Sequence, residues 1–232
     1  MAYWRGLTYN GSLLTYGDHT LADYPSADMN PYNLPPWTIR IEYAFDTHGP
    51  IIPSLGFPQT HVDHFGNGNV WDVSLSESTH PDYWFNSLFR TNEPDDNPHT
   101  VLAYKLGDPN LLRVLGAYAP GLTNLDGMFA NCHNLREVCL FDTRYVKAWY
   151  GAFGGCTKLQ YLPRFDVSSA VSMDFMCSHC LMVTGGALDL YNDASSTGLV
   201  SSHYFTFAYC GKNTTTGAAE LAQIPDDWKF AR

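Results

Sequence analysis

The amino-acid sequence predicts an α/β repeat protein, a short solenoid of 24-residue units behind an N-terminal β-rich region. Two patterns lead to this fold class: a repeat with a 24-residue step in the second half, and apolar–polar alternation from Trp37 to Phe45. The composition supplies enough core material, since 45% of the 232 residues are hydrophobic and only 16% are charged. Disordered chains have few apolar residues and much charge, so that class is excluded.

The charge balance narrows the range of partners. With 13 Lys and Arg against 23 Asp and Glu, the net charge is −10, and no basic cluster is present to hold phosphate backbones or anionic lipid. No apolar run approaches the roughly 20 residues of a membrane span. The polar, Gly-rich segment after Met1 lacks the apolar stretch of a secretory signal. We therefore expect no nucleic acid partner, no membrane insertion and no export signal in this sequence.

Three regions follow one another along the chain. Residues 1–34 are rich in Tyr, Gly, Asn, Asp and Pro without a helical period, and predict an extended N-terminal arm or a small hairpin. Residues 35–105 predict a β-rich capping or attachment region, and residues 106–232 predict the repeats with a C-terminal cap. Within the capping region we expect strands at 37–45 and 70–75, a loop at 49–69, a short helix at 83–89 and a polar loop at 93–98.

The repeat is carried by three cysteines, Cys132, Cys156 and Cys180, each 24 residues from the next. A fourth unit arrives with Cys210, further along the chain than the same step from Cys180 would place it, which indicates inserted residues near 195–202. A period of 24 lies within the roughly 20–29 residues of leucine-rich repeats. Flanking apolar residues keep the same step and predict a structural core of Leu111, Phe129, Cys132, Leu135, Val138, Phe153, Cys156, Leu159, Leu162 and Cys180.

One such unit cannot bury its own apolar face, so neighbouring units must stack and the end units must be capped. In each unit we expect a short Leu-x-x-Val/Leu strand and one helical turn that carries residues 128–129 or 152–153 inward. Val146 and Val171 should fill the corner between strand and turn. The capping region precedes the first unit, and residues 225–228 follow the last unit and should close the other end.

The units resemble a known family. Residues 125–143 and 152–168 match, nearly position by position, the MFxxCxxLxxVxxFDTSxV unit of the BspA-like leucine-rich repeats, which occur on bacterial surface proteins and in gut-associated phage genomes. Residues 34–40 and 69–73 are similar to segments that precede the repeats in phage and prophage members. The resemblance covers about residues 35–228. It implies an adhesin or a virion surface protein, with no catalytic residues to carry over.

Two groups have residue types that bind metals. Cys177 and Cys180 have the spacing of half a zinc site, with His179 beside them, but no second pair follows and Cys180 is already a core position of the repeat. Residues 61–64 place two histidines around Asp63 in a Gly- and Pro-rich segment without a helical frame. Buried thiols and surface histidines explain both groups, so we expect no metal and no cofactor.

Carboxylate pairs raise the question of glycoside hydrolysis, which needs two acids flanking the scissile bond. None of the pairs lies in a recognisable motif, and the sequence holds no GxSxG, P-loop or dinucleotide-binding pattern. We expect no enzyme, and a glycan-acting enzyme is the weakest of the alternatives. The pairs considered are Asp95 with Asp96, Asp226 with Asp227, and Glu42 with Asp72.

Aromatic residues favour a contact surface. The 15 Tyr and 6 Trp supply rings with an apolar face and a polar handle, which sugar-binding and protein-binding surfaces use. The positions between the core residues of each strand should face solvent, and the turn between units should expose further rings. The candidate binding residues are Arg136, Glu137, Tyr150, Gln160 and Tyr161.

These observations predict a non-enzymatic interaction protein. We expect a phage virion surface component, associated with the tail or the capsid, that uses a leucine-rich-repeat face for host adhesion or for decoration of the particle. Its partners would be other virion proteins, a host cell-surface protein or glycan, or further copies of the chain in a homo-oligomer. The alternative is a bacterial adhesin, located outside the cell or on the cell surface, that binds host protein or glycan.

Overall fold

A computed structural model of the chain describes residues 3–9, 12–15, 30, 32–50, 60–66, 68–75, 88–89 and 107–230. The polar loop expected at 93–98, with Asp95 and Asp96, lies outside these residues, as does most of the helix expected at 83–89. In the N-terminal region, β1 (Tyr3–Tyr9) pairs antiparallel with β2 (Ser12–Thr15). No helix within the described part of the chain is long and apolar enough to cross a membrane.

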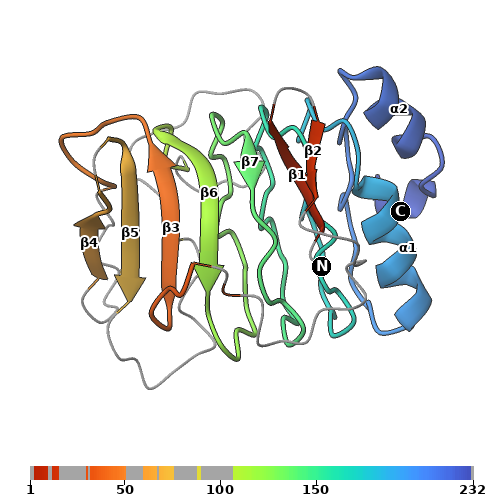
Figure 1. Ribbon diagram of the computed structural model, residues 1–232. Helices are drawn as coiled ribbons and strands as arrows, with labels where there is room; N and C mark the ends of the chain where they lie inside the picture. The colour runs from red at the N-terminus through yellow and green to blue at the C-terminus, as the bar shows by residue number, and fades with distance from the viewer. Residues whose placement is uncertain are drawn as a thin grey trace.

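A mixed five-stranded sheet with the order β4-β5-β3-β6-β7 occupies the left half of the molecule in the view of Figure 1. Its central strand, β3 (Thr38–Tyr43), pairs antiparallel with β5 (Val70–Leu75) on one side and with β6 (Leu111–Tyr118) on the other. The two-residue period decides which side chains are buried: Ile39, Ile41 and Tyr43 face the core, and Arg40 and Glu42 face outward. Strands from the capping region and the repeat region therefore share one sheet.

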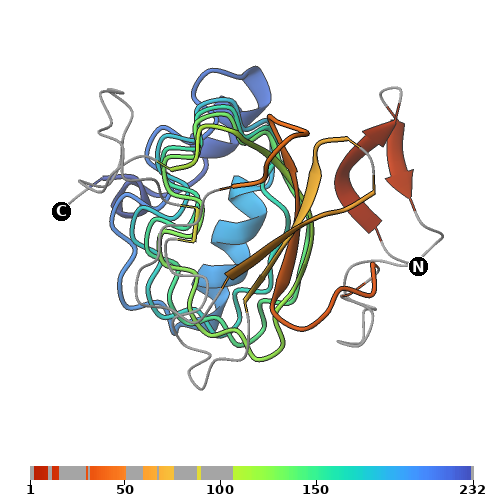
Figure 2. The same cartoon turned by 90° about the vertical axis from the view of Figure 1, so that its left-hand side faces the viewer.

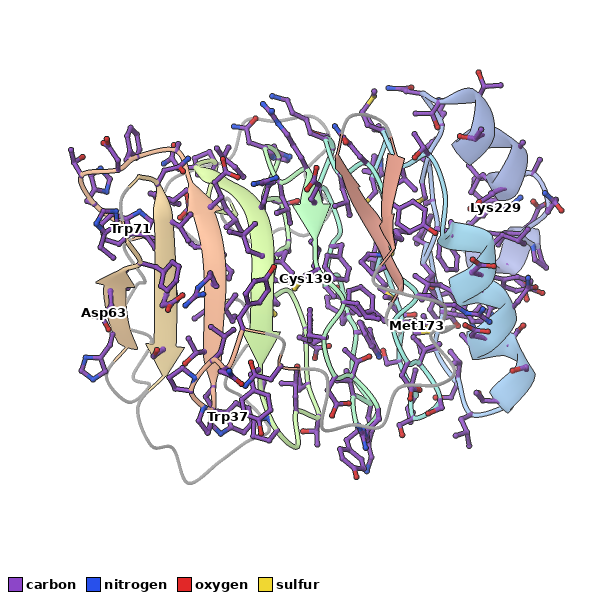
Figure 3. The ribbon with its side chains drawn as sticks, viewed as in Figure 1. Trp37, Asp63, Trp71, Cys139, Met173 and Lys229 are labelled. Atoms are coloured by element: carbon purple, nitrogen blue, oxygen red, sulfur yellow. The ribbon has the colours of Figure 1, made fainter. Side chains whose placement is uncertain are left out.

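The edge strand β4 (Thr60–His64) lies where the sequence predicts a loop, so that part of the prediction is wrong. It pairs antiparallel with β5 through a tight connection in which Gly66 and Gly68 adopt positive φ angles of 68° and 104°. Asp63 is exposed on this strand (Figure 3). An edge strand of mainly polar residues carries no hydrophobic alternation, which is why the pattern did not reveal it.

The repeats are joined by backbone hydrogen bonds in a regular register. Parallel bridges link Asn124 to Ala148, Ala148 to Ser172, and Ser172 to Ser202, so the first two steps are equal and the third is longer. We define unit 1 as residues 124–147, unit 2 as 148–171, unit 3 as 172–201, and unit 4 as starting at 202. Alternate N–H groups in the first eight residues of units 1 to 3 donate to carbonyls of the next unit at 2.7–2.9 Å.

A second ladder runs along the other part of each unit. The N–H of Arg136 in unit 1 donates to a carbonyl of β6 at 2.9 Å, and the N–H groups of Gln160 and Thr184 each donate to a carbonyl of the preceding unit, at 3.0 and 2.8 Å. In units 1 to 3, only β7 (Glu137–Val138) forms a regular strand here, parallel to β6. We call this second ladder the strand side. We call the first ladder, made by the first eight residues of each unit, the turn side. Figure 2 looks along the stack and shows the coils of successive units lying behind one another.

The core fills the space between the two ladders. Phe129 and Phe153 stack with ring centroids 5.4 Å apart, and Phe153 also stacks on Phe165 at 5.5 Å. Val146 is buried, but Val171 is 41% exposed, so it does not fill the corner expected of it. The residues named as structural core all have an exposed fraction of 8% or less: Leu111, Phe129, Cys132, Leu135, Val138, Phe153, Cys156, Leu159, Leu162 and Cys180.

Phe89 extends this core toward the sheet. Its N–H donates to the carbonyl of Met128 at 3.3 Å, and its ring stacks on Phe129 at 5.5 Å. Its carbonyl accepts from the N–H of Asp108 at 2.6 Å, just as the carbonyl of Phe129 accepts from Cys132. Phe89 therefore takes the place that Phe129 would have in a preceding unit, although the two residues are not separated by the step of the repeat.

The C-terminal end of the stack is covered by short helices (Figure 1). Unit 3 is the longer unit and contains α1 (Ala187–Thr197), which begins before the insertion expected near 195–202 and overlaps it only at its last residues; α2 (Thr215–Leu221) follows unit 4. The carboxylate of Glu220 on α2 accepts N–H groups of residues 186–188, and so caps α1, whose own N-cap Gly186 has no side chain to do so. The last turn, η4 (Asp226–Trp228), presents Trp228 to the ring of Phe207 at 6.1 Å.

The described structure is thus a mixed five-stranded sheet with two short helices and a hydrogen-bonded stack of units. Helices α1 and α2 were not predicted from the sequence. The turn expected in each unit is not helical, because every one of these turns contains residues with positive φ. The assignment of the stack to the leucine-rich-repeat solenoids stays a prediction.

Candidate interaction surfaces

The strand side brings together four of the five candidate binding residues. Arg136 and Gln160 are exposed and stand one unit apart on the ladder, and Thr184 continues it. Glu137 and Tyr161 lie beside them and are half-buried. This surface can contact a partner through one guanidinium, one amide and one phenol.

Ion pairs on the outer face of the sheet border this surface. Arg40 donates two hydrogen bonds to Asp72, from Nε at 2.7 Å and from Nη2 at 2.8 Å. Arg113 lies between two carboxylates, donating to Glu42 and, at 3.5 Å, to Glu137. Glu137 is therefore partly neutralised, and Glu42 and Asp72 belong to separate ion pairs instead of forming a pair of acids.

Tyr150 lies on the turn side, away from the ladder of Arg136 and Gln160. It packs edge-on against Phe175 of unit 3, with ring centroids 5.7 Å apart. Phe175 in turn stacks on Phe205 of unit 4 at 5.2 Å, with ring planes 17° apart. The sequence already places Tyr150 at the turn between units, apart from the strand positions of Arg136 and Gln160.

Each unit has two backbone positions with positive φ on the turn side, the fourth and the eighth residues of the unit. Gly and Asn adopt this conformation readily, whereas other L-residues lose about 1–2 kcal/mol each. Units 1 and 2 use residues suited to it, and units 3 and 4 use bulky rings. The residues in order are Gly127 and Asn131, Gly151 and Gly155, Phe175 and His179, and Phe205 and Tyr209.

The four rings at these strained positions form two rows, and Tyr150, whose φ is not positive, joins the first row. The first row is Tyr150, Phe175 and Phe205, and the second is His179 and Tyr209, whose ring centroids lie 4.8 Å apart. Tyr209 is 42% exposed, and the others are half-buried. We call the five residues the turn-side rows. Four of them were not among the binding residues predicted from the sequence, although the sequence shows rings there in columns that hold Gly or Asn in units 1 and 2.

Carboxylates next to the turn-side rows hold the units together. Asp126 accepts the N–H of Tyr150 at 2.7 Å, and Asp174 accepts the N–H of Tyr204 at 2.6 Å, one unit further on each time. Burial raises the pKa of Asp126 above its ordinary value. In unit 3, which contains Met173 (Figure 3), Asp174 also accepts the hydroxyl of Ser202 at 2.6 Å.

All six cysteines are free and buried. The thiols of Cys156 and Cys180 donate to the carbonyls of Phe129 and Phe153, each at 3.1 Å. Burial raises the pKa of Cys180 to about 12 and that of Cys177 well above its usual range, so neither is poised as a thiolate to bind zinc. Among the residues that the structure describes, no three His, Cys, Asp or Glu side chains are grouped so as to hold a metal ion.

His61 and His64 differ in surroundings, although both are exposed on β4. The ring of His64 lies 4.5 Å from that of Trp71 on β5, and its Nε2 is paired with the carbonyl of Gly68. Three residues apart on a strand, the two histidines point to opposite faces, an arrangement unsuited to joint metal ligation.

Asp108 occupies the cysteine position of the unit that would precede unit 1, one repeat step before Cys132. Asp108 is only 5% exposed, and its carboxyl accepts hydrogen bonds from the Tyr43 hydroxyl at 3.3 Å and from the N–H of Asn110 at 2.9 Å. Burial raises the pKa of Asp108. Burial, followed by the neighbouring Asp108 carboxyl, raises the pKa of Tyr43 to about 12.

Asp226 and Asp227 are adjacent at the C-terminal turn, but their carboxylates lie against different basic side chains. Asp226 pairs with Lys229 at 3.0 Å (Figure 3), and Asp227 lies 3.6 Å from His203. In both of the described pairs considered above, Glu42 with Asp72 and Asp226 with Asp227, each acid therefore lies against a different basic side chain. Comparison of the chain with family models, curated proteins and solved structures finds no match.

Proposed function

We propose that this chain is a non-enzymatic interaction protein that presents the side chains of stacked units to a partner. The single observation that carries this proposal is the register of the units: exposed residues such as Arg136 and Gln160 recur along a hydrogen-bonded ladder. Repeated units in register make an extended surface whose contacts add up along the stack, which is how repeat proteins bind.

The proposal includes a fold assignment, a BspA-like leucine-rich repeat. Support comes from the parallel bridges that join each unit to the next in register and from the burial of the Phe and Cys columns. The chemistry of the reactive groups also favours binding over catalysis. The thiols donate to backbone carbonyls, and Asp126 and Asp174 accept backbone N–H groups, so these groups already serve the fold.

We place the protein on the surface of a phage virion, associated with tail or capsid, in host adhesion or decoration. This placement rests on the sequence resemblance. Antibodies against the recombinant chain should label purified particles from the source culture, and the chain should be found by mass spectrometry of those particles. Its absence from the particles would refute the placement.

The alternative is a bacterial cell-surface adhesin. In that case, the same antibodies would label intact cells in a culture free of particles, and protease treatment of the cells would remove the signal. The third candidate, a glycan-acting enzyme, predicts release of products from a glycan panel, abolished by the change of a single carboxylate. Such turnover would overturn the non-enzymatic proposal.

A further inference from the structure

Strand β4 forms an open edge of the five-stranded sheet. Among the described strands it has one hydrogen-bonded neighbour, β5, and it lies at the end of the sheet in Figure 1. Its residues, Thr60–His64, include neither Lys nor Pro, and their register with β5 contains no bulge. Lys, Pro and bulges are the usual means by which proteins keep a sheet edge from pairing with another chain. β4 is therefore an edge that can accept a further strand.

The register with β5 decides which backbone groups of β4 point outward. The N–H of Phe65 donates to the carbonyl of Val70 at 3.0 Å. Hydrogen-bonded pairs alternate along an antiparallel ladder, so His61 and Asp63 also bond to β5. The residues between them direct their N–H and C=O groups toward the open edge, and within the described part of the chain these backbone groups have no hydrogen-bond partner: Thr60, Val62 and His64.

The outward groups of β4 are complementary to those of a second copy of the strand. In an antiparallel pair centred on Val62, Val62 would exchange hydrogen bonds with Val62 of the second copy, and Thr60 with His64. His61 would then lie opposite Asp63 of the second copy, and Asp63 opposite its His61. These are the pairs without backbone hydrogen bonds, in which opposed side chains lie closest. Both side chains are exposed, so an imidazole N–H can donate to the carboxylate.

Charge favours this register over the neighbouring ones. Asp63 lies opposite Asp72 of β5, whose carboxylate already accepts two hydrogen bonds from Arg40, so Asp63 gains from a donor on its open side. Centring the pair on Asp63 would place two carboxylates opposite each other, which is destabilising. Centring it on His61 would leave Asp63 outside the paired segment. Either shift also leaves one outward-pointing residue of each copy unpaired.

We infer that the chain forms a two-fold symmetric dimer in which two β4 strands pair antiparallel about Val62, joining two five-stranded sheets into one. The two-fold contact uses the same edge of both copies, so assembly closes at the dimer. Five residues a side are few beside the roughly 20–30 of a standard interface, so the dimer should be weak, with a Kd on the order of 10–100 µM. This inference goes beyond the proposed function and does not depend on it.

Sedimentation equilibrium of the full chain, from about 1 to 500 µM, measures the dimer. Val62→Pro removes an outward N–H and blocks the edge with its ring, while the ladder to β5 keeps its hydrogen bonds. Asp63→Lys replaces the acceptor for His61 with a cation. The matched control is Asp166→Lys, which makes the same change of charge at an exposed position of unit 2.

The full chain and Asp166→Lys should dimerise alike. Val62→Pro should stay monomeric throughout, and Asp63→Lys should raise the Kd by about tenfold. Melting curves report whether the variants fold, and if Val62→Pro does not, Asp63→Lys decides the result.

Disulfide cross-linking tests the register itself. His61→Cys chains mixed with Asp63→Cys chains and oxidised glutathione should link rapidly, because opposed residues of this kind have Cα atoms about 4.5 Å apart. Either variant alone places its cysteines diagonally, about 7–8 Å apart, and should link far more slowly. The six native cysteines are buried and so do not compete.

Three outcomes overturn the inference: a monomer at every concentration, a dimer that neither Val62→Pro nor Asp63→Lys weakens, or equal rates of linking in the mixed and the separate cysteine variants. Each of these results leaves the proposed function intact, because that proposal is tested by the labelling of particles.

Discussion

Phe153 is the residue on which the stacked core can be tested most directly. Its side chain is fully buried between the rings of Phe129 and Phe165, at 5.4 and 5.5 Å. Truncating a buried Phe costs about 3–5 kcal/mol. A carboxylate in the same place must also be desolvated or protonated, so Phe153→Asp should cost at least the upper end of that range, about 5 kcal/mol. Arg136→Ala, at an exposed position, should stay within about 0.5 kcal/mol.

The measurement is thermal and urea unfolding followed by tryptophan fluorescence, because Trp149 is buried in unit 2. For a chain of this size, 1 kcal/mol corresponds to about 2–4 °C in Tm. Phe153→Asp should therefore lower the Tm by about 10–20 °C, and Arg136→Ala by less than about 2 °C. Phe153→Leu, which loses the stacking but stays apolar, should fall between them. Equal Tm values for Phe153→Asp and Arg136→Ala would refute the register of the repeat.

Three further predictions concern single groups. Because burial raises the pKa of Asp108 in the folded chain, the wild type should lose stability as the pH rises from about 4 through the folded pKa. Asn cannot ionise, so the free energy of unfolding of Asp108→Asn, measured in urea and compared with that of the wild type, should grow as the pH rises. A difference between the two that does not change with pH would contradict this prediction. Glu220→Ala should cost about 1 kcal/mol and speed amide exchange at residues 186–188, whereas Glu220→Gln keeps an acceptor and should change less. Unchanged exchange in Glu220→Ala would show that the cap does not form. Gly155→Ala should be more destabilising than Gly198→Ala: both have positive φ, but a Cβ at Gly155 would lie 2.2 Å from Asn131 Oδ1, and one at Gly198 meets open space. Equal losses of Tm would mean that Asn131 moves aside.

The repeat could be read from the sequence because its signal is local and periodic. The Cys column at 132, 156 and 180 and the Phe column at 129 and 153 mark positions that each unit buries. The alternation from Trp37 to Phe45 likewise marks a strand with one buried face, and β3 falls within it. The strand-side candidates could be named for the same reason, since they stand between buried columns.

Other features gave no such signal. β4 is an edge strand without apolar alternation, and α1 interrupts the repeat with residues that belong to no column. Phe89 joins the Phe stack from outside the repeat step. The sequence places Tyr150 at the turn between units, but it holds no signal that this ring packs against Phe175 of the next unit.

By itself, the sequence determined the step of the repeat and the side chains that it buries, because one apolar residue type returning at one interval is a property of the chain alone. Only the tertiary structure decided which residues meet between units: the capping of α1 by Glu220, the burial of Asp108 against Tyr43, and the stacking of Phe175 on Phe205. These contacts join residues far apart in the chain, and they come into existence only when neighbouring units hydrogen-bond in register and bring those residues side by side.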